Sequence, residues 1–294
     1  MLSERQADAV VVWAPAKVNL YLEVLAKRAD GYHEIATLMV AVSLYDTLEF
    51  KEETSGEIQF DCDHPDLAAA LDNLVLRAAG LLRQRTGCRS GARVKLAKRI
   101  PIAAGLAGGS TDAAATLAGL NELWRLGLRP SELALLGAEL GSDVAFFFAT
   151  PAAWCTGRGE QVAPLALGQP LWFVLVCPPF GLSTAEVYRG VTVPDQPLTG
   201  EPILQAVRQG TVEEIGRCLY NRLEPVALVL CPALAGIQAW LAGSGPAGQA
   251  MSGSGSSLFA LCRDHDEALR IARELHSRAD QGMNSRVFIV RSCS

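Results

Sequence analysis

The first part of the chain alternates between apolar and polar residues, as a half-buried strand does. From Val18 to Val24, Val and Leu occupy every second position and form one face. Lys17, Asn19, Tyr21 and Glu23 fall on the other face, because successive side chains of a strand point in opposite directions. This pattern predicts a strand whose second face, with Lys17 and Asn19, points away from the core.

Further segments with strand periodicity are short and lie on both sides of a long central region. They predict strands at 10–13, 35–44, 47–51, 58–62, 92–97, 171–177, 249–251, 257–262 and 286–291. Those of the N-terminal region are expected to pair antiparallel. The pattern relaxes around Pro164 to Pro170, so a domain boundary is placed between residues 166 and 167.

Helical spacing of apolar residues, together with capping residues at the ends, predicts the helices. One begins after Asp72 and Asn73 and ends at Gly87, and a capping box at Ser183 and Glu186 starts another. The remaining helices are expected from Thr111 to about Trp124 and at 131–140, 201–209, 212–221, 232–242 and 264–278.

The segment KRIPIAAGLAGGSTDAAATLAGLNELW, residues 98–124, reads as the end of a strand, a glycine loop and a helix. Three glycines leave the loop backbone accessible, and Ser110, Thr111 and Asp112 are good N-cap residues. Backbone N–H groups at the positive end of a helix are a ready site for phosphate oxygens. The segment therefore predicts a phosphate-binding loop, whereas the alternative is a glycine turn with an ordinary cap.

The better-known phosphate motifs do not fit this chain. No Gly-Lys pair is followed by Ser or Thr, which excludes a Walker A loop. One G-x-G-x-x-G occurs at Gly243, Gly245 and Gly248, but it follows a helical segment and contains Pro246. A dinucleotide fingerprint follows a strand and opens a helix, so this stretch is interpreted as a linker.

Composition narrows the functional class. The 294 residues are 50% hydrophobic and 19% charged, which is typical of a globular protein with room for two domains. Lys and Arg number 26 against 31 Asp and Glu, a net charge of −5 that argues against a general nucleic-acid or anionic-membrane binder. A small-molecule substrate is expected, with no obligate protein partner, no nucleic acid and no membrane.

The eight cysteines are scattered and form neither a C-x-x-C motif nor a cluster with histidine. We expect free thiols in a reducing compartment and no zinc site. Pro178, Pro225 and Pro232 interrupt the apolar runs before they reach the length of a membrane span, and the N-terminus has no features of a signal peptide. These observations predict a cytoplasmic protein.

Several polar residues near the predicted turns are candidates for chemistry, each with a structural alternative. Lys17 and Asn19 share a strand face that solvent alone could explain. Asp143 precedes Phe146 to Phe148 and could be the N-cap of a short helix. Tyr32 and His33 follow an Asp-Gly turn, where a histidine is usually structural. SGSGSS, residues 252–257, could be a plain hairpin or a second loop close to a ligand.

Together these segments offer a cation and an amide on a strand, a phosphate-binding loop, and a carboxylate after Gly141. Phosphoryl transfer to an alcohol requires such groups, because the protein must neutralise the transferring group, hold it in line and accept the hydroxyl proton.

At this point the sequence resembles a known family. APAKVNLYLEVLAKRADGYHEI, KRIPIAAGLAGGSTDAAATLAGLN, LGSDVAFFF with GRGE, and MSGSGSS resemble, in order, the motifs of the GHMP small-molecule kinases. The resemblance covers Ala14 to about Phe259. Within the family, the Asp-Gly-Tyr-His cluster is similar to that of kinases acting on methylerythritol linked to cytidine diphosphate, in the non-mevalonate isoprenoid pathway.

The resemblance implies an α+β fold with two domains. Residues 1–166 would form a ribosomal-protein-S5-domain-2-like domain with the phosphate loop and the catalytic residues. Residues 167–294 would form a ferredoxin-like domain that contributes to substrate binding. It also implies ATP and Mg²⁺ as cofactors and a tertiary hydroxyl as the phosphoryl acceptor; no metal ligand can be named from the sequence.

Site residues are carried over from the motifs. Asp143 would be the general base with Lys17 as its partner, and Asn19 would orient the acceptor. Asn73 and Lys98 would lie near the nucleotide. Tyr32, His33, Thr184 and Tyr188 would contact the substrate. The triphosphate would be held by Pro101, Ile102, Ala103, Ala104, Gly105, Leu106, Ala107, Gly108, Gly109, Ser110 and Thr111.

Two positions of the loop depart from the family pattern, which commonly has glycine at Ala103 and Ala107. A methyl group is tolerated there without strain only if both residues keep a negative φ. Two alternatives remain open: a GHMP kinase acting on mevalonate, homoserine or a sugar, and a non-catalytic nucleotide- or RNA-binding protein that uses the S5-like half.

Overall fold

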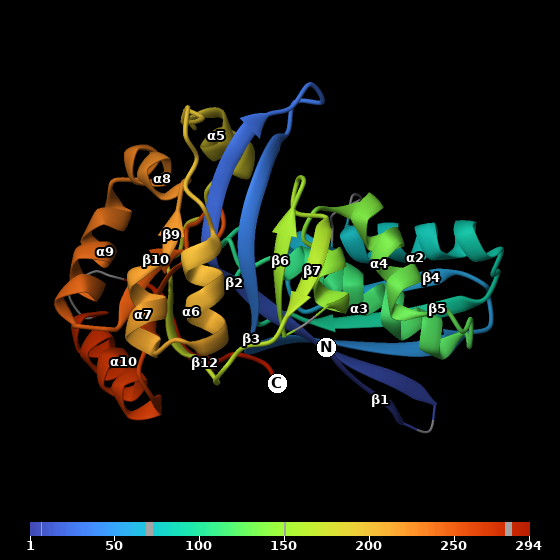
Figure 1. The fold of residues 1–294 in the computed structure, drawn as a ribbon. Coiled ribbons are helices and arrows are strands. Elements are labelled where there is room, and N and C mark those ends of the chain that lie inside the picture. The colour runs from blue at the N-terminus through green and yellow to red at the C-terminus, as the bar shows by residue number, and fades with distance from the viewer. Residues whose placement is uncertain (7, 69–72, 150, 280–283) are drawn as a thin grey trace. The chain divides into compact units, whose positions relative to one another are not determined.

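The structure is a computed structural model that describes residues 1–6, 8–68, 73–149, 151–279 and 284–294 (Figure 1). Its contacts separate the chain into two compact units. The first comprises Met1–Ala16, Leu44–Ile100 and Ala107–Thr150, and the second comprises Lys17–Ser43, Pro101–Leu106 and Pro151–Ser294. The α+β class is confirmed. The boundary predicted after residue 166 remains a prediction, since residues on its N-terminal side contribute to both units.

Two long strands contain division points between the units. Strand β2 spans Ala9–Lys27 and β3 spans His33–Glu53. Each is one continuous strand where the sequence pattern predicted two shorter strands. Pro15 lies between the residues of β2 that pair with β1, which end at Trp13, and those that pair with β9, which start at Tyr21. Its missing backbone donor therefore interrupts neither ladder.

In the first unit, β1 (Leu2–Gln6) pairs antiparallel with the start of β2, and β5 (Gly91–Ala97) pairs antiparallel with the end of β3. Strand β4 (Ile58–Cys62) is parallel to β5, which corrects the expectation of an entirely antiparallel N-terminal region. The helices of this unit are α1 (Pro65–Ala68), α2 (Leu74–Thr86), α3 (Gly108–Leu123), α4 (Pro130–Leu140) and the 3₁₀ turn η1 (Ala145–Phe148).

Local capping explains the ends of α2 and α4. The Asn73 side chain accepts a hydrogen bond from the Val75 backbone, 2.9 Å long, and Gly87 ends α2 at φ 70°. Helix α4 begins at Pro130, in the first turn where proline fits, and ends before Gly141. These ends agree with the prediction; Asp72, the other expected cap of α2, lies outside the described residues.

In the second unit, β6 (Ala152–Thr156) and β7 (Gln161–Leu165) form a hairpin across Gly157–Glu160, as predicted, and β6 pairs with the first part of β3. A separate antiparallel sheet has the order β10 (Gly248–Met251), β11 (Leu258–Cys262), β8 (Trp172–Cys177), β12 (Arg286–Arg291). The other elements are α5 (Thr184–Arg189), α6 (Glu201–Gln209), α7 (Val212–Arg217), β9 (Tyr220–Asn221), α8 (Glu224–Leu230), α9 (Ala233–Gly243) and α10 (His265–Ala279).

Helices α9 and α10 pack on the four-stranded sheet, and a continuous apolar core lies between them (Figure 1). The predicted helix at 212–221 ends earlier, at Arg217, because Tyr220 and Asn221 join β2 as strand β9. Helix α8 was not predicted, and Pro225 stands in its first turn. Gly243 to Gly248 connects α9 to β10, which agrees with its interpretation as a linker.

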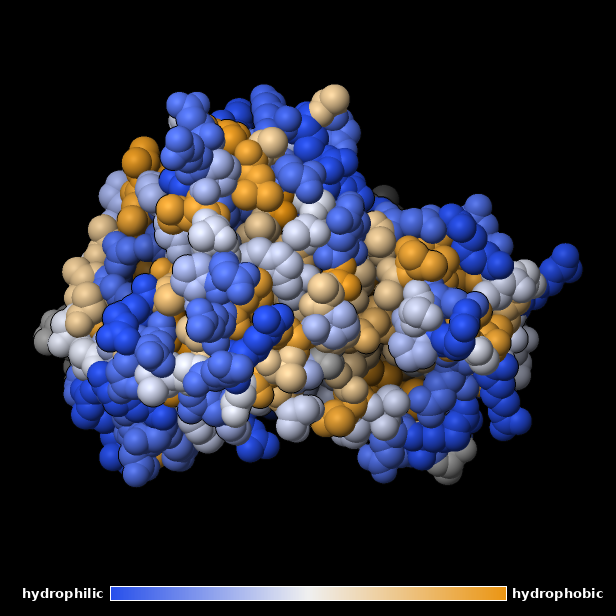
Figure 2. All heavy atoms as spheres, in the orientation of Figure 1, coloured by the Kyte–Doolittle hydropathy of each residue, from blue (hydrophilic) through white to orange (hydrophobic). Residues whose placement is uncertain are grey.

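Apolar side chains are exposed on α8. Val229 is 80% exposed and Leu230 is 49% exposed, and Figure 2 shows hydrophobic surface over this helix. No helix in the described part of the chain is both long and apolar enough to span a bilayer.

Small residues let α3 lie close to the sheet of the first unit. Ala113 to Ala115 are fully buried, and a Cβ atom added at Gly119 would overlap the buried ring of Phe50 on β3. Trp124, just after the helix, donates from Nε1 to the Gly91 carbonyl at 3.1 Å. The close packing of Gly119 on Phe50 therefore helps to set the position of α3, and hence of its N-terminus.

We expect Gly119→Ala to destabilise the protein by about 1–3 kcal/mol, because overpacking against Phe50 outweighs the better helix propensity of alanine. Gly80→Ala in α2 is the control, since the added Cβ has no neighbour within 4 Å. That variant should gain about 0.5–1 kcal/mol. Urea unfolding followed by circular dichroism compares the two, and equal stability of both variants would contradict the packing argument.

Candidate functional site

Helix α3 begins at Gly108, earlier than the start predicted near Thr111. Its N-cap is Ala107, which has no capping side chain, and Ser110, Thr111 and Asp112 all lie inside the helix. The prediction of these residues as caps was therefore wrong, because the two glycines can themselves enter the helix. The N-cap residue thus leaves the N–H groups at the helix start without a side-chain cap of its own, which suits an anion.

The condition for an unstrained methyl group at Ala103 and Ala107, a negative φ, is not met. Their φ values are 53° and 55°, in the left-handed region, as is that of Gly105 at 74°. A non-glycine residue costs about 1–2 kcal/mol in this conformation. The loop therefore has the backbone shape that glycines would give, at the expense of local strain.

Gly105 lies against the second glycine loop, residues 252–257. The Ser252 hydroxyl donates to the Gly105 carbonyl at 2.9 Å, and the Ser257 N–H donates to the Ala104 carbonyl at 3.2 Å. A Cβ atom at Gly105 would overlap the Ser252 carbonyl oxygen. The segment 252–257 is therefore more than a hairpin connection: it supports residues 104–105 of the first loop.

Two residues that sequence reasoning missed hold this second loop in place. Asn221 donates from Nδ2 to the carbonyls of Met251 and Gly253, at 2.7 and 2.8 Å. The Glu224 carboxylate accepts from the Met251 N–H at 2.7 Å, and burial raises the pKa of Glu224. The only sequence signal was two polar residues close together, one at the end of the predicted helix 212–221 and one just after it.

Lys17 and Asn19 lie in a buried network on β2, which corrects the prediction that this face points away from the core. The Lys17 ammonium donates to Asn19 Oδ1 at 2.6 Å, and Asn19 donates to Thr37 Oγ1 at 2.8 Å. The two side chains belong to residues only 3% and 1% exposed. A Cβ at Gly253 would lie 3.1 Å from Lys17 Nζ, so the ammonium is beside the second loop.

Lys98 is buried between two carboxylates of the first unit. Its ammonium lies 2.5 Å from Asp46 Oδ2 and 2.6 Å from Asp112 Oδ2. Burial lowers the pKa of Lys98, but the two carboxylates prevail and raise it. Asn73, the other residue expected near the nucleotide, uses its side chain to cap α2 and to donate to the Leu67 carbonyl.

Asp143 is half-buried in the turn that joins α4 to η1. The residue at the N-cap position of η1 is Val144, so the alternative interpretation of Asp143 as that cap does not hold. The turn itself is closed by a hydrogen bond from the Val144 N–H to the Gly141 carbonyl, 3.2 Å long.

The candidate substrate residues form one aromatic pair, one cation–π contact and one hydroxyl contact. The His33 and Tyr188 rings have centroids 5.3 Å apart, and burial lowers the pKa of His33, with Lys27 contributing. Tyr32 is 54% exposed, and the Arg158 guanidinium lies 4.9 Å from its ring centroid. The Thr184 hydroxyl is 2.8 Å from that of Ser254 in the second loop. Arg158 was not singled out from the sequence.

Metal ligands are sparse in the parts of the chain that the structure describes. They contain no group of three or more His, Cys, Asp or Glu side chains that could hold an ion. Thr111 Oγ1, in the first turn of α3, is buried and has no hydrogen-bond partner among them. An oxygen of this kind fits Mg²⁺, which prefers oxygen ligands and usually takes few from the protein.

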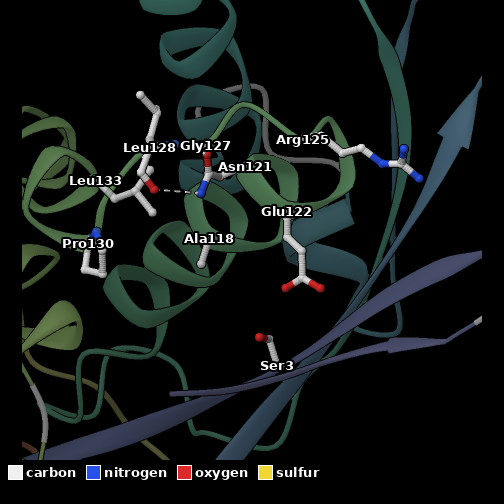
Figure 3. Close-up of a pocket in the computed structure, with 9 residues that line it drawn as sticks. All are labelled: Ser3, Ala118, Asn121, Glu122, Arg125, Gly127, Leu128, Pro130 and Leu133. Carbon is white, nitrogen blue, oxygen red and sulfur yellow. Dashed lines mark hydrogen bonds between the residues drawn. The ribbon is translucent and has the colours of Figure 1, made fainter.

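A surface depression of about 490 Å³ lies elsewhere on the first unit (Figure 3). Ser3 of β1, Asn121 and Glu122 of α3, and Leu133 of α4 are among the residues that line it. None of the predicted site residues belongs to it, and we assign it no role.

Comparison with known proteins gives consistent matches over the chain. Residues 73–150 match the GHMP kinases N terminal domain and residues 203–281 match GHMP kinases C terminal. The 4-diphosphocytidyl-2-C-methyl-D-erythritol kinase of Pelotomaculum thermopropionicum is 42% identical over 281 residues, covering 95% of this chain and 98% of that protein. The enzyme of the same name from Shouchella clausii is 44% identical over 270 residues, or 91% of each chain.

Solved structures agree with these matches. A crystal structure of 4-(cytidine 5'-diphospho)-2C-methyl-D-erythritol kinase has a TM-score of 0.80 and 36% identity, covering 97% of this chain and 100% of that one. A homoserine kinase from Cytophaga hutchinsonii has a TM-score of 0.77 at 19% identity, covering 100% and 97%, and shares the fold.

We expect Ala107→Gly to leave stability unchanged or raise it by up to about 1 kcal/mol, because relief of the left-handed strain offsets the backbone entropy of glycine. Ala107→Val should lower stability by more than 1 kcal/mol, roughly, since a β-branched residue resists positive φ. Thermal unfolding of the three proteins measures the difference. A valine variant as stable as wild type would contradict the observed φ.

Proposed function

The chain belongs to the GHMP kinase family, in the branch whose curated members are named 4-diphosphocytidyl-2-C-methyl-D-erythritol kinase, and from this membership we propose its reaction. It transfers the γ-phosphoryl group of ATP to the 2-hydroxyl of 4-(cytidine 5'-diphospho)-2-C-methyl-D-erythritol, in the non-mevalonate isoprenoid pathway. The observation that carries the proposal is identity of 42% over 95% of the chain to a kinase of that name. Eight free cysteines favour the cytoplasm as its location.

The triphosphate is proposed to bind at Pro101 to Thr111. The start of α3 supplies backbone N–H groups, and the loop that leads into it has left-handed residues at Ala103, Gly105 and Ala107. Mg²⁺ would be held by Thr111 together with phosphate oxygens, and when bound it neutralises charge on the transferring group. Lys98 and Asn73 are proposed to lie near the nucleotide.

Asp143 is proposed to take the proton of the attacking hydroxyl, and Lys17 to stabilise the charge that develops during transfer. Asn19 would orient both Lys17 and the acceptor, since its Oδ1 accepts from the ammonium while its Nδ2 is fixed by Thr37. A buried lysine held in one geometry supports this role, because preorganised charge needs no rearrangement during the reaction.

Tyr32, His33 and Tyr188 are proposed to recognise the cytosine ring, and Thr184 to lie beside the substrate. Stacking on an aromatic face accepts every base, whereas a polar edge contact discriminates between them. His33 could take part in both stacking and edge contact, since its ring packs on Tyr188 and its lowered pKa favours the neutral imidazole.

The reaction is tested by ADP release with the cytidine-diphosphate substrate, with mevalonate, homoserine and a sugar as competing acceptors. We expect turnover with the cytidine-diphosphate substrate and none with mevalonate, homoserine or the sugar. Asp143→Asn should then lower kcat by roughly 10²-fold or more while calorimetry shows ATP still bound. Asp195→Asn, a substitution of an exposed aspartate, is the control and should match wild type. Near-normal turnover of Asp143→Asn would exclude it as the base.

Base recognition is tested by kcat/KM for the cytidine substrate and its uridine analogue. Tyr188→Ala should weaken the cytidine substrate roughly 5- to 150-fold, the range for loss of one stacked base. His33→Ala should lower the ratio of kcat/KM for the cytidine substrate to that for the uridine analogue. A site that hydrogen-bonds a group rejects the analogue that lacks it, and the variant loses the side chain proposed to make this bond. His265→Ala removes a histidine that packs on Trp172, at 4.7 Å between centroids, and serves as the control. An unchanged ratio in His33→Ala would make His33 a structural turn residue.

A further inference from the structure

Three buried charged residues connect two strands of the first unit to helix α3. Asp46 comes from β3, Lys98 directly follows β5, and Asp112 lies in the first turns of α3. Their side chains are 0%, 5% and 4% exposed, and Lys98 Nζ lies 2.5 and 2.6 Å from the two carboxylates. The ammonium thus bridges the sheet and the helix.

The two carboxylates are not equally satisfied. Asp46 Oδ1 accepts from the Arg99 and Ile100 N–H groups at 2.6 and 2.8 Å, while its Oδ2 accepts from Lys98. Asp112 Oδ1 is buried and lacks a hydrogen-bond partner within the described ranges. The Asp112 carboxylate thus meets the ammonium of Lys98 through its other oxygen, Oδ2.

The cluster lies directly against the start of α3. A Cβ atom at Gly108 would be 2.9 Å from Lys98 Nζ and 3.1 Å from Ile100 Cγ2. The first residue of the helix therefore packs on the bridging ammonium. Any shift of this ammonium would move the turn whose N–H groups are proposed to bind phosphate.

We propose that Asp46, Lys98 and Asp112 form a positioning cluster, in which Lys98 holds the phosphate-binding turn in place and does not itself bind phosphate. The inference rests on the proposed function, since that function assigns ATP to this turn. Turning the ammonium toward a phosphate would leave two buried carboxylates without a cation, and breaking a buried pair in this way is strongly unfavourable. A positioning role agrees with the contacts, whereas a phosphate ligand would have to abandon them.

The charge balance of the cluster supports this assignment. Burial raises the pKa of Asp112 to about 7, and the nearby Asp46 carboxylate adds to the increase while Lys98 opposes it. Two buried carboxylates therefore share one ammonium, and together they balance its positive charge. Such a cluster has no spare positive charge to offer a ligand.

The test is a double-mutant cycle of Lys98→Met, Asp112→Asn and the two combined. ATP affinity is measured by calorimetry without an acceptor, and Tm by thermal unfolding. Lys98→Met should lower Tm by roughly 5–15 °C and weaken ATP binding about tenfold or more, since buried carboxylates lose their cation and the turn shifts. The combined variant should recover most of the Tm and bind ATP within about threefold of wild type, because Asn can donate to Asp46 and restore the link.

A phosphate ligand gives the opposite result, because removing Asp112 cannot replace a cation lost from the nucleotide. If the combined variant keeps the ATP defect of Lys98→Met while its Tm recovers, the proposal is wrong. Lys95→Met removes an exposed lysine from β5 itself and is the control for general loss of positive charge. It should leave both readouts unchanged.

A second comparison keeps the test decisive if Lys98→Met does not fold. Asp112→Asn retains an acceptor for Lys98, whereas Asp112→Ala removes the link to α3. ATP binding should weaken at least about tenfold in the alanine variant relative to the asparagine variant. Equal affinities overturn the proposal. A wild-type protein that binds no ATP would refute the proposed function instead, and the Tm values of the cycle would still decide whether the cluster fixes α3.

Discussion

The close approach of two backbone segments at Gly105 is the constraint on which the site residues of the second unit depend. Residues 104 and 105 are bonded to Ser252 and Ser257, and the Lys17 N–H donates to the Leu106 carbonyl at 3.2 Å. Strand β2 and both loops are therefore fixed to one another. Because no side chain can be added at Gly105, the arrangement leaves little freedom to any of these segments.

Asn221 and Glu224 extend this constraint to the rest of the second unit. Asn221, the last residue of β9, and Glu224, the first residue of α8, bond to Met251 at the end of β10, and Asn221 also bonds to Gly253 in the second loop. Strand β9 in turn pairs with β2 at Tyr21 and Leu22. The second loop is thus connected to the strand of Lys17 in two ways, through the first loop and through β9.

What the sequence could predict was local. The caps Asn73, Gly87 and Gly141 and the hairpin at 157–160 follow from neighbouring residues, and the structure has all of them. The burial of the second face of β2 depends on distant residues, so periodicity could not show it. Glu23, for example, is fully buried because Arg222 and the Leu198 N–H contact its carboxylate.

The same limit applies to the candidate site. The family motifs supplied the loop, Lys17 and Asp143, whose roles remain predictions. They did not indicate Asp46, Asn221 or Glu224, and they offered Asp112 only as a helix cap, because the importance of these residues comes from partners far away in the chain. A polar residue in an apolar strand or a helix looks the same whether it is solvated or bonded in the interior.

The two left-handed alanines have a consequence for whether this loop can be moved to other proteins. Together they cost about 2–4 kcal/mol, a substantial part of the roughly 5–15 kcal/mol that stabilises a typical folded chain. A free peptide with the sequence of residues 98–124 would relax to negative φ and lose the shape. The loop is therefore a property of the whole fold and not a transferable module, so grafting its sequence onto another scaffold would carry over the residues without their geometry.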